Sequence, residues 1–527
     1  MQTINKVDNA APEDGRAPVN PWLIAVAVIV PTFIEVLDTT VVSVALQNIA
    51  GNLAATISQA TWIQTGYLIS NAIVLPASAW FSALFGRKRF LLVCIGIFTL
   101  ASFACGAAPN LPFLIFASIV QGAGGGALQP ISQAVLMESF PPAKRGAAMA
   151  AYVLGVVLAP VLGPVVGGWL TENYSWRWIF YINIPCGLFA MWMIQQFVSD
   201  PEYIGKAKRG RIDALGFLVL AIWLGTLQTV LNKGQDEDWF NSNYICWLSV
   251  ISVVAFAAFV VREFSIREPL ADLRVFADRN FLFASILVSV VFLLLYGIMN
   301  LQPLMAQGLM GYTAYRSGLT QISRGWGLLV LTPVAGLLVG KVDNRLLVGP
   351  GMLLIAVAAL MMGDFSLDIS SHDFFWPNFI QGMGMALTMV PLMTVALATI
   401  SNLQMGNATG LYALVRNLAG SIGIAVAIAM QSRGGLRHQA YLVAHLTPYD
   451  QPYQNAMQAG PAVMAHSLGA AQAGPGTLGA IYQSLILHSN MLGFVDEYRW
   501  LAMVCLLSVP LVLLFKKGDG KREVMMH

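Results

Sequence analysis

Four charged side chains lie deep inside long apolar stretches of this sequence. Glu35 and Asp38 are three residues apart in the first stretch. Arg324 and Arg416 occupy two separate stretches of the second half. If the first stretch is helical, Glu35 and Asp38 share one face, where two close carboxylates do not both ionise easily. Such a pair can hold and release a proton, while the arginines supply compensating positive charge. The alternative interpretation is a static buried ion pair that fixes helix packing.

The overall composition explains why these four charges are exceptional. Of the 527 residues, 57% are hydrophobic and 10% are charged, and the mean hydropathy is +0.68. Soluble domains carry about 25% charged residues. This much apolar surface needs lipid as its solvent, which excludes a soluble globular protein and indicates an all-α integral membrane protein. A charge in hydrocarbon costs at least about 2.5 kcal/mol on insertion scales, so a functional use is expected for each of the four.

Other classes of protein are disfavoured by the remaining residues. The net charge is only +3 and the basic residues are dispersed, so no nucleic-acid partner is expected. The five cysteines lie in apolar runs without CxxC spacing, so neither a metal site nor a disulfide framework is expected. The GAGGGA run at 122–127 lies in an apolar stretch without a preceding strand, and GLLVGK at 336–341 lacks phosphate-loop spacing. We therefore expect that the chain binds no cofactor and is not an enzyme.

About fourteen apolar runs are long enough to cross a bilayer, which takes about 20 helical residues. The runs lie at 22–48, 58–84, 90–108, 112–137, 147–170, 178–198, 212–232, 243–262, 280–307, 316–340, 346–363, 374–400, 407–431 and 498–515. The first is too long for the apolar core of a cleavable signal peptide. With the N-terminus inside, 21 of the 29 Lys and Arg residues fall on the cytoplasmic side and six outside. Because cytoplasmic loops retain positive charge, both termini are expected in the cytoplasm.

An internal repeat divides the chain into two halves. FLIFASIVQGAGGGALQP at 113–130 resembles FFWPNFIQGMGMALTMVP at 374–391. The repeat unit is six helices, and parallel six-helix halves with a substrate site between them are typical of rocker-type secondary transporters. The predicted domains are a cytoplasmic tail at 1–21, an N-terminal half at 22–198, a linker with two inserted helices at 199–279, a C-terminal half at 280–515 and a cytoplasmic tail at 516–527.

A long outward region at 432–497 is poor in acidic residues and rich in Ala, Gly, Gln and His. We favour a partly helical cap or hairpin over the outer mouth. The alternative is a docking surface for an extracytoplasmic partner. The spacing of its four histidines fits no metal-ligand motif, so no metal is expected. These histidines are His438, His445, His466 and His488.

The run GVVLAPVLGPVVGG at 155–168 is the most specific motif. Small residues recur every four positions, which lets another helix approach closely, and two prolines bend the helix. The spacing resembles the GxxxGPxxGG pattern that marks the fifth helix of antiporters in the major facilitator superfamily, with Ala159 in place of the middle glycine. The matching positions are Gly155, Pro160, Gly163, Pro164, Gly167 and Gly168.

Further segments extend this resemblance over residues 22–515. LDTTVVSVAL at 37–46, WRWIFYINIP at 176–185, the Arg324-Gly325 pair and RNLAGSIG at 416–423 are similar to signatures of the fourteen-helix drug:proton antiporters, the EmrB/QacA group. The resemblance implies the major facilitator fold, with two six-helix halves plus two inserted helices, in a bacterial inner membrane. It also implies proton-coupled multidrug export of hydrophobic or amphipathic compounds by alternating access.

The resemblance favours the EmrB-like branch, and this branch implies partner proteins. It implies a periplasmic membrane-fusion adaptor that leads to an outer-membrane channel. Two alternatives stay open. One is an exporter dedicated to a single metabolite, lipid or siderophore, and the other, from a different class, is a membrane scaffold with no transport cycle.

Two departures from the superfamily pattern bear on mechanism. The cytoplasmic loop motif keeps Gly86, Arg87 and Lys88 but has Ala83 where an acidic residue is usual, so the loop is expected to lack its acidic partner. Ser118 stands where the superfamily usually has an arginine before its Gln-Gly pair. Proton coupling is therefore expected to rest on other groups.

Those groups are the four buried charges. Asp38, which matches the family motif, is expected to carry the proton, with Glu35 either sharing that role or meeting a cationic substrate. Arg416 and Arg324 are expected to supply positive charge. Substrate is expected in a central cavity between the halves, although each candidate side chain can instead satisfy helix contacts. The candidates are Tyr67, Asn71, Gln129, Tyr296, Asn300 and Gln302.

Overall fold

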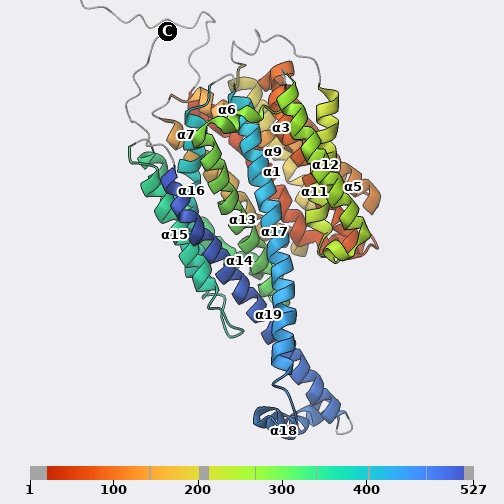
Figure 1. Cartoon of the computed structure of the whole chain (residues 1–527). Helices are drawn as coiled ribbons and strands as arrows, with labels where there is room; N and C mark the ends of the chain where they lie inside the picture. The colour runs from red at the N-terminus through yellow and green to blue at the C-terminus, as the bar shows by residue number, and fades with distance from the viewer. Residues whose placement is uncertain are drawn as a thin grey trace, which may run out of the picture.

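The computed structural model describes residues 20–141, 144–200, 213–266, 269–339, 341–401, 404–469 and 472–514. The described chain forms a bundle of long helices (Figure 1). Most of the predicted N-terminal tail at 1–21, the C-terminal tail at 516–527 and the basic stretch 201–212 of the linker lie outside the described residues.

The N-terminal half begins with α1, where Asn20 caps the helix by accepting a hydrogen bond from the Trp22 N–H and proline occupies the first helical position. Its α5 and α6 together form one membrane span from Leu111 to Ser139. The helices of this half are α1 (Pro21–Asn52), α2 (Ile57–Ala60), α3 (Trp62–Phe85), α4 (Arg87–Gly106), α5 (Leu111–Gly125), α6 (Leu128–Ser139), α7 (Arg145–Asn173), α8 (Trp178–Tyr181) and α9 (Asn183–Phe197).

Two inserted helices separate this half from the C-terminal half. They are α11 (Ala214–Lys233) and α12 (Asn243–Ser265), which pack against each other. The C-terminal half comprises α13 (Arg279–Gly308), α14 (Ala314–Leu338), α15 (Arg345–Met362), α16 (Phe375–Ala398), α17 (Met405–Val443), α18 (Gln451–Leu468) and α19 (Ala473–Ser508). Short 3₁₀ turns η2 (Trp239–Asn241), η3 (Leu273–Ala277) and η4 (Val509–Leu514) complete the described elements.

In the described part of the chain, thirteen helical stretches are long and apolar enough to cross a membrane. The predicted run at 316–340 is the one that falls short. It is present as α14, a 25-residue helix packed against both α7 and α16. Arg316, Arg324 and several Gln, Ser and Thr residues lower its hydropathy. Arg316 is exposed near one end of the helix, whereas neighbouring helices bury Arg324 and most of the other polar side chains.

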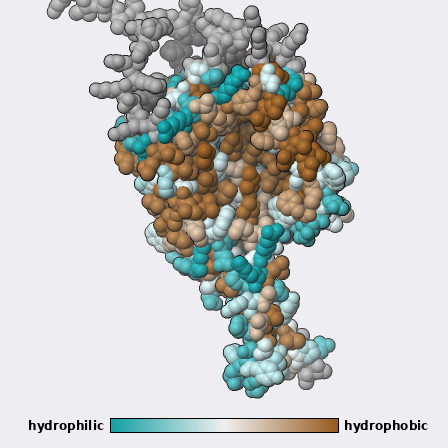
Figure 2. Space-filling model, viewed as in Figure 1, coloured by the Kyte–Doolittle hydropathy of each residue, from teal (hydrophilic) through white to brown (hydrophobic). Residues whose placement is uncertain are grey.

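The outer surface of the bundle is apolar. Figure 2 shows a hydrophobic band across the middle of the bundle, with hydrophilic residues toward both ends. Large apolar side chains in contact with the surroundings include Leu100, Phe116, Val253, Leu337 and Leu507. In water such a surface would drive aggregation, whereas in a bilayer it faces lipid tails. The predicted all-α membrane protein is therefore confirmed, and the chain is a multi-pass membrane protein.

Residues 432–497 differ from the predicted loop in their helix boundaries. The helix α17 continues to Val443 and α19 already begins at Ala473, with α18 between them. At 1.5 Å per residue, the 39 residues of α17 span about 58 Å, which is longer than a bilayer core. Figure 1 shows α17 and α19 extending beyond the other helices and carrying α18 at their tip. We call residues 432–497 the projecting hairpin, and the end of the bundle from which it extends the hairpin side.

The small-residue motif of α7 serves two interfaces. A Cβ atom on Gly163 would lie 2.0 Å from the Thr40 Oγ1 atom of α1, so only glycine permits this approach. On its other side α7 meets α14 of the second half, where a Cβ atom on Gly168 would lie 3.2 Å from the Tyr315 backbone. The motif therefore joins α1 to α7 within one half and joins the two halves to each other.

Candidate functional site

A cavity of about 930 Å³ lies between the two halves. Its lining combines apolar side chains with amides and two carboxylates from helices of both halves. It extends to helix ends on the hairpin side, where Asn48, Glu172 and Thr313 line it. At the opposite end the halves close on each other, since a Cβ atom on Gly146 would lie 2.9 Å from the Gly336 carbonyl oxygen. The cavity is thus accessible from the hairpin side alone.

Asp38 lies in the wall of this cavity and is 3% exposed. The Asn183 amide donates a hydrogen bond to its Oδ1 at 2.6 Å, and the Gln121 amide donates to its Oδ2 at 3.0 Å. Asn183 begins α9, and Gln121 lies on α5. Each carboxylate oxygen is therefore held by one neutral donor, and these donors tie α1 to two other helices of its own half.

Glu35 lies one turn away on α1 and is held in the same manner. The Asn71 amide donates to Oε1 at 2.8 Å, and the Gln129 amide donates to Oε2 at 2.7 Å. The Tyr67 hydroxyl donates to the Glu35 carbonyl oxygen at 3.4 Å. Three of the predicted substrate residues, Tyr67, Asn71 and Gln129, thus line the cavity and also bind Glu35.

Arg416 enters from the C-terminal half, on α17. It lines a small closed space between the halves together with Tyr152 of α7, and its guanidinium lies 5.0 Å from the centre of the Phe292 ring. Its Nε atom has no hydrogen-bond partner within the described residues. Its charge acts on Glu35 across the interface of the halves. Arg416 is therefore placed to compensate Glu35, while amides alone hold Asp38.

Arg324 lies apart from both carboxylates, fully buried inside the C-terminal half. Four side-chain amides accept hydrogen bonds from its guanidinium. They are Gln381 at 2.7 Å, Asn378 at 2.7 Å, Gln321 at 3.0 Å and Gln302 at 3.1 Å. In the described part of the chain no carboxylate forms an ion pair with Arg324. Gln302, a predicted substrate residue, faces this cluster and does not line the cavity.

The two remaining predicted substrate residues come from α13. Tyr296 lines the cavity and packs under Gly420, where an added Cβ atom would lie 3.1 Å from the ring. Asn300 also lines the cavity, and its amide donates a hydrogen bond to the Tyr296 carbonyl oxygen at 2.9 Å. The structure therefore brings five of the six predicted residues to one cavity, from both halves, and places Gln302 elsewhere.

The internal repeat places matching amides in the two halves. Gln121 and Gln381 stand before equivalent glycines in the repeated segments, and they bind Asp38 and Arg324 respectively. Both glycines pack against a backbone carbonyl group of a neighbouring helix. A Cβ atom on Gly122 would lie 2.3 Å from the Tyr67 carbonyl oxygen, and one on Gly382 would lie 2.0 Å from the Arg324 carbonyl oxygen. The same structural position thus holds an anion in one half and a cation in the other.

The sequence analysis missed the amide partners Gln121, Asn183, Asn378 and Gln381. A Gln-Gly pair in both repeats and an asparagine in the 176–185 signature were the available indications. An amide in an apolar run is common enough to pass as a helix contact, so neither the pair nor the asparagine identified a partner by itself. In the described ranges, no three His, Cys, Asp or Glu side chains are grouped to hold a metal ion.

The expected lack of an acidic partner for the Gly86–Lys88 loop is wrong. Arg87 forms an ion pair with Glu138 of α6. The Lys88 backbone N–H donates to Asp200 at 2.7 Å. Gly86 has a φ of +86°, and a Cβ atom there would lie 2.8 Å from the Asp200 carboxylate. The acids come from distant parts of the chain, which the local motif at 79–89 could not reveal.

Comparison with known proteins identifies the family of this chain. The family model described as Major Facilitator Superfamily matches residues 28–424. The chain is 36% identical over 429 residues to the multidrug export protein EmrB of Escherichia coli strain K12, covering 81% of this chain and 83% of that protein. It is 33% identical over 492 residues to the fatty acid resistance protein FarB of Neisseria gonorrhoeae, covering 93% of this chain and 95% of that protein.

Among solved structures, the chain resembles the proton:xylose symporter XylE bound to 6-bromo-6-deoxy-D-glucose, with a TM-score of 0.59. The alignment covers 95% of this chain and 97% of that chain at 14% sequence identity. At this identity the likeness concerns the fold alone. It agrees with two six-helix halves arranged around a central cavity.

Proposed function

This chain belongs to the Major Facilitator Superfamily, and we propose that it is a multidrug efflux transporter driven by the proton gradient. The observation that carries the proposal is the cavity between the halves, accessible from one side, whose wall contains two buried carboxylates. The relatives EmrB and FarB are named for the export of drugs and for fatty acid resistance. A cavity, a titratable pair and such relatives together favour secondary active export over a scaffold.

The cavity lining supports hydrophobic or amphipathic substrates. Apolar side chains such as Leu68, Met299 and Ile424 alternate with neutral amides around the wall. Apolar walls bind molecules of varied shape because apolar contacts require no fixed orientation, and a few amides orient the polar end of a molecule. Five candidate residues, Tyr67, Asn71, Gln129, Tyr296 and Asn300, are proposed to contact substrate. Gln302 is proposed to act indirectly, by holding Arg324.

Proton coupling is proposed to centre on Asp38. An ionised carboxylate accepts a hydrogen bond at each oxygen, as Asp38 does from Gln121 and Asn183. A proton removes the negative charge and leaves one oxygen a weaker acceptor, so the hydrogen bonds from the amides are weakened. Protonation from the hairpin side would then loosen α1 and favour the conformation that faces the opposite side. Release of the proton there restores both contacts and resets the carrier.

Glu35 and Arg416 are proposed to link this step to the interface of the halves. In this proposal the charge of Arg416 on α17 attracts Glu35 on α1 across the interface while Glu35 is ionised. A proton or a cationic substrate at Glu35 weakens that attraction. Arg324 lacks a carboxylate partner within the described residues, so its proposed role is to hold the polar interior of the C-terminal half together.

The membrane orientation is also a proposal. We assign both termini to the cytoplasm of a bacterial inner membrane and the hairpin side to the periplasm, because 21 of 29 basic residues then lie inside. The projecting hairpin would then extend into the periplasm. Its exposed aromatic residues Tyr441, Tyr449 and Tyr482 support docking of a membrane-fusion adaptor that leads to an outer-membrane channel.

Proton flux in liposomes tests the proposed function. Purified protein in vesicles with an internal pH-sensitive dye is challenged with a panel of lipophilic cations, neutral amphiphiles and fatty acids. Compound-dependent proton movement with several chemical classes is the expected result. Movement with a single class would favour a dedicated exporter, for which the FarB relative gives fatty acids as the first candidate. No movement with any compound would favour a scaffold.

A further inference from the structure

The inserted helix α11 presents a polar face to the central cavity. Gln228 and Asn232 are four residues apart on α11, so their side chains lie on one face, and Gln235 follows in the turn directly after the helix. All three line the cavity, as does Leu231 between them. A helix inserted outside two six-helix halves has no need of such a face for packing in lipid. Its presence at the cavity is a contribution from outside the twelve-helix core.

The amides of this face have spare hydrogen-bonding capacity. Gln228 is 2% exposed and Asn232 is half-buried. Their side chains form one long hydrogen bond with each other, in which the Asn232 amide nitrogen donates to the Gln228 side-chain oxygen Oε1 at 3.5 Å. A carboxamide offers two donor hydrogens and two acceptor lone pairs, and leaving these unmet in a membrane is costly. The face is therefore prepared for a partner that occupies the cavity.

The hairpin-side end of α11 bridges the two halves. The Lys233 ammonium group donates to the Thr61 hydroxyl at 2.5 Å, beside the start of α3. The Gln235 amide donates to the Ser432 hydroxyl of α17 at 3.5 Å. Because these contacts reach one helix of each half, α11 closes the cavity on the side between α3 and α17.

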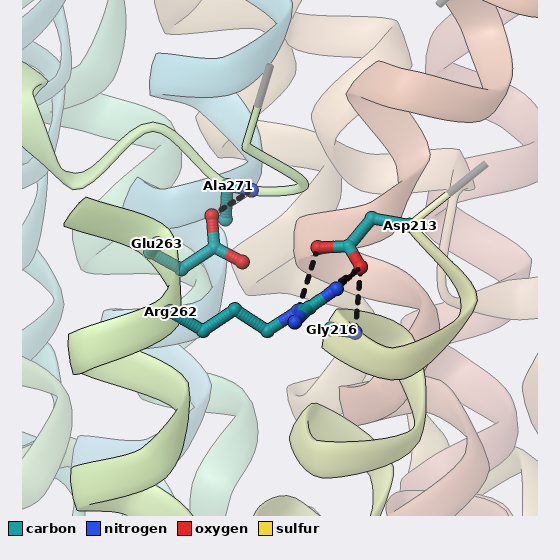
Figure 3. A network of polar contacts seen from close by, with 5 residues as sticks. All are labelled: Asp213, Gly216, Arg262, Glu263 and Ala271. Atoms are coloured by element: carbon teal, nitrogen blue, oxygen red, sulfur yellow. Dashed lines mark hydrogen bonds and ion pairs between the residues drawn. The ribbon is translucent and has the colours of Figure 1, made fainter. Parts of the chain in front are cut away.

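The opposite end of the inserted pair is equally anchored. In Figure 3 the Asp213 carboxylate points toward the Arg262 guanidinium and the Gly216 N–H, which joins α11 to α12. Burial disfavours the ionised form of Asp213, but the hydrogen bonds from Arg262 and Gly216 outweigh burial and lower its pKa below the usual value. Glu263 accepts a hydrogen bond from the Ala271 N–H at 3.0 Å, which fixes the chain that leads to the C-terminal half.

We propose that α11 is a wall of the substrate cavity and that Gln228 and Asn232 form a subsite for the neutral hydrogen-bonding group of an amphipathic substrate. The amides carry no net charge, so they suit an aromatic amine, amide, hydroxyl or carbonyl group rather than a formal ion. The proposal rests on the proposed efflux function. It assigns a substrate-recognition role to a helix that the twelve-helix architecture lacks.

Thiol accessibility tests whether α11 is a cavity wall. Gln228→Cys and Asn232→Cys are made separately in full-length protein with Cys186→Ser and Cys246→Ser, because both native cysteines are partly exposed. Thr226→Cys is the matched control, since Thr226 lies two residues away on the other face and does not line the cavity. A membrane-impermeant thiol reagent added from the hairpin side should modify the first two variants at least tenfold faster than the control. Equal rates would overturn the proposal.

Binding of two probe cations tests the subsite. Ethidium carries two amino groups, and tetraphenylphosphonium has no hydrogen-bonding group. Gln228→Met combined with Asn232→Leu keeps side-chain size and removes the amides, and should weaken ethidium binding about tenfold while tetraphenylphosphonium binding changes less than twofold. Thr226→Val is the control. Unchanged ethidium binding would overturn the subsite. A wild-type protein that binds neither probe would reject lipophilic cations as substrates and overturn the subsite, while the proton-flux result would still decide the efflux function and the thiol result the wall.

Discussion

Asp38 and Glu35 lie one turn apart on α1 and yet meet different partners. Asp38 is bound by neutral amides of its own half, whereas Glu35 is also within the field of Arg416 from the other half. The sequence could suggest both carboxylates because a charge in an apolar run is rare. It could not divide their roles, because Gln121 and Asn183 lie 83 and 145 positions after Asp38, and Arg416 lies 381 positions after Glu35.

Substitution of Asp38 by Asn should abolish gradient-driven export and leave substrate binding measurable. The amide keeps the size of the carboxylate but has no proton to exchange, so the two conformations no longer differ in proton affinity. Transport into inverted vesicles is compared with equilibrium binding to the purified variant. Full pH-driven transport by Asp38→Asn would reject the coupling role and return Asp38 to a structural contact.

Substitution of Glu35 by Gln should mainly alter preference among substrates. The variant loses the negative charge that attracts cations and balances Arg416, while an amide can still take part in hydrogen bonds with Asn71 and Gln129. We expect the ratio of cationic to neutral compounds exported to fall at least fivefold, with export of neutral compounds within twofold of the wild type. An equal loss for both classes would instead place Glu35 in the coupling step.

At the scale of the elements, the close packing of α1 on α7 depends on glycine. Gly163→Val should lower the melting temperature of the detergent-solubilised protein, because the new atoms would overlap Thr40. Overpacking of this kind costs about 1–3 kcal/mol. Gly51→Val is the matched control, since nothing lies within 4 Å of a Cβ atom at Gly51, near the end of α1. Equal melting temperatures for Gly163→Val and the wild type would contradict the close approach.

Hydropathy and motifs together predicted the number and order of the bundle helices. They predict helix ends and polar contacts less well where a helix is surrounded by other helices or extends beyond the bundle, because hydropathy reports only the match to lipid. The run at 316–340 was predicted as a span and is present as α14, although it is not among the thirteen stretches of the described chain that are long and apolar enough to cross a membrane. The ends of α17 and α19 were misplaced because, beyond the bundle, their exposed turns carry polar residues such as Arg433 and Arg437. The amides that α11 presents to the cavity were missed because Gln228 and Asn232, two amides in an apolar helix, show no partner until the cavity is seen.

For the whole molecule, the first question is orientation. Single cysteines at 450 and 520 are tested with an impermeant thiol reagent added to intact cells. We expect labelling at Asp450→Cys, in the projecting hairpin, and none at Gly520→Cys, because basic residues concentrate on the side assigned to the cytoplasm. Permeabilised cells, in which both positions should react, provide the control. Labelling at Gly520→Cys alone in intact cells would invert the assignment.

The second question is whether transport requires the closed end of the cavity to open. At that end α3 meets α17, where a Cβ atom at Gly406 would lie 3.6 Å from the Cβ atom of Ala79. This separation lies within the range that a disulfide spans, about 3.5–4.5 Å. Oxidation of the Ala79→Cys, Gly406→Cys double variant should therefore lock the end shut.

We expect export by the cross-linked protein to fall at least tenfold, binding from the hairpin side to persist, and reduction to restore transport. Each single variant should transport normally under oxidation. If the cross-linked protein exported at the wild-type rate, substrate would have to pass without separation of α3 from α17, and alternating access by rocking of the two halves would be excluded.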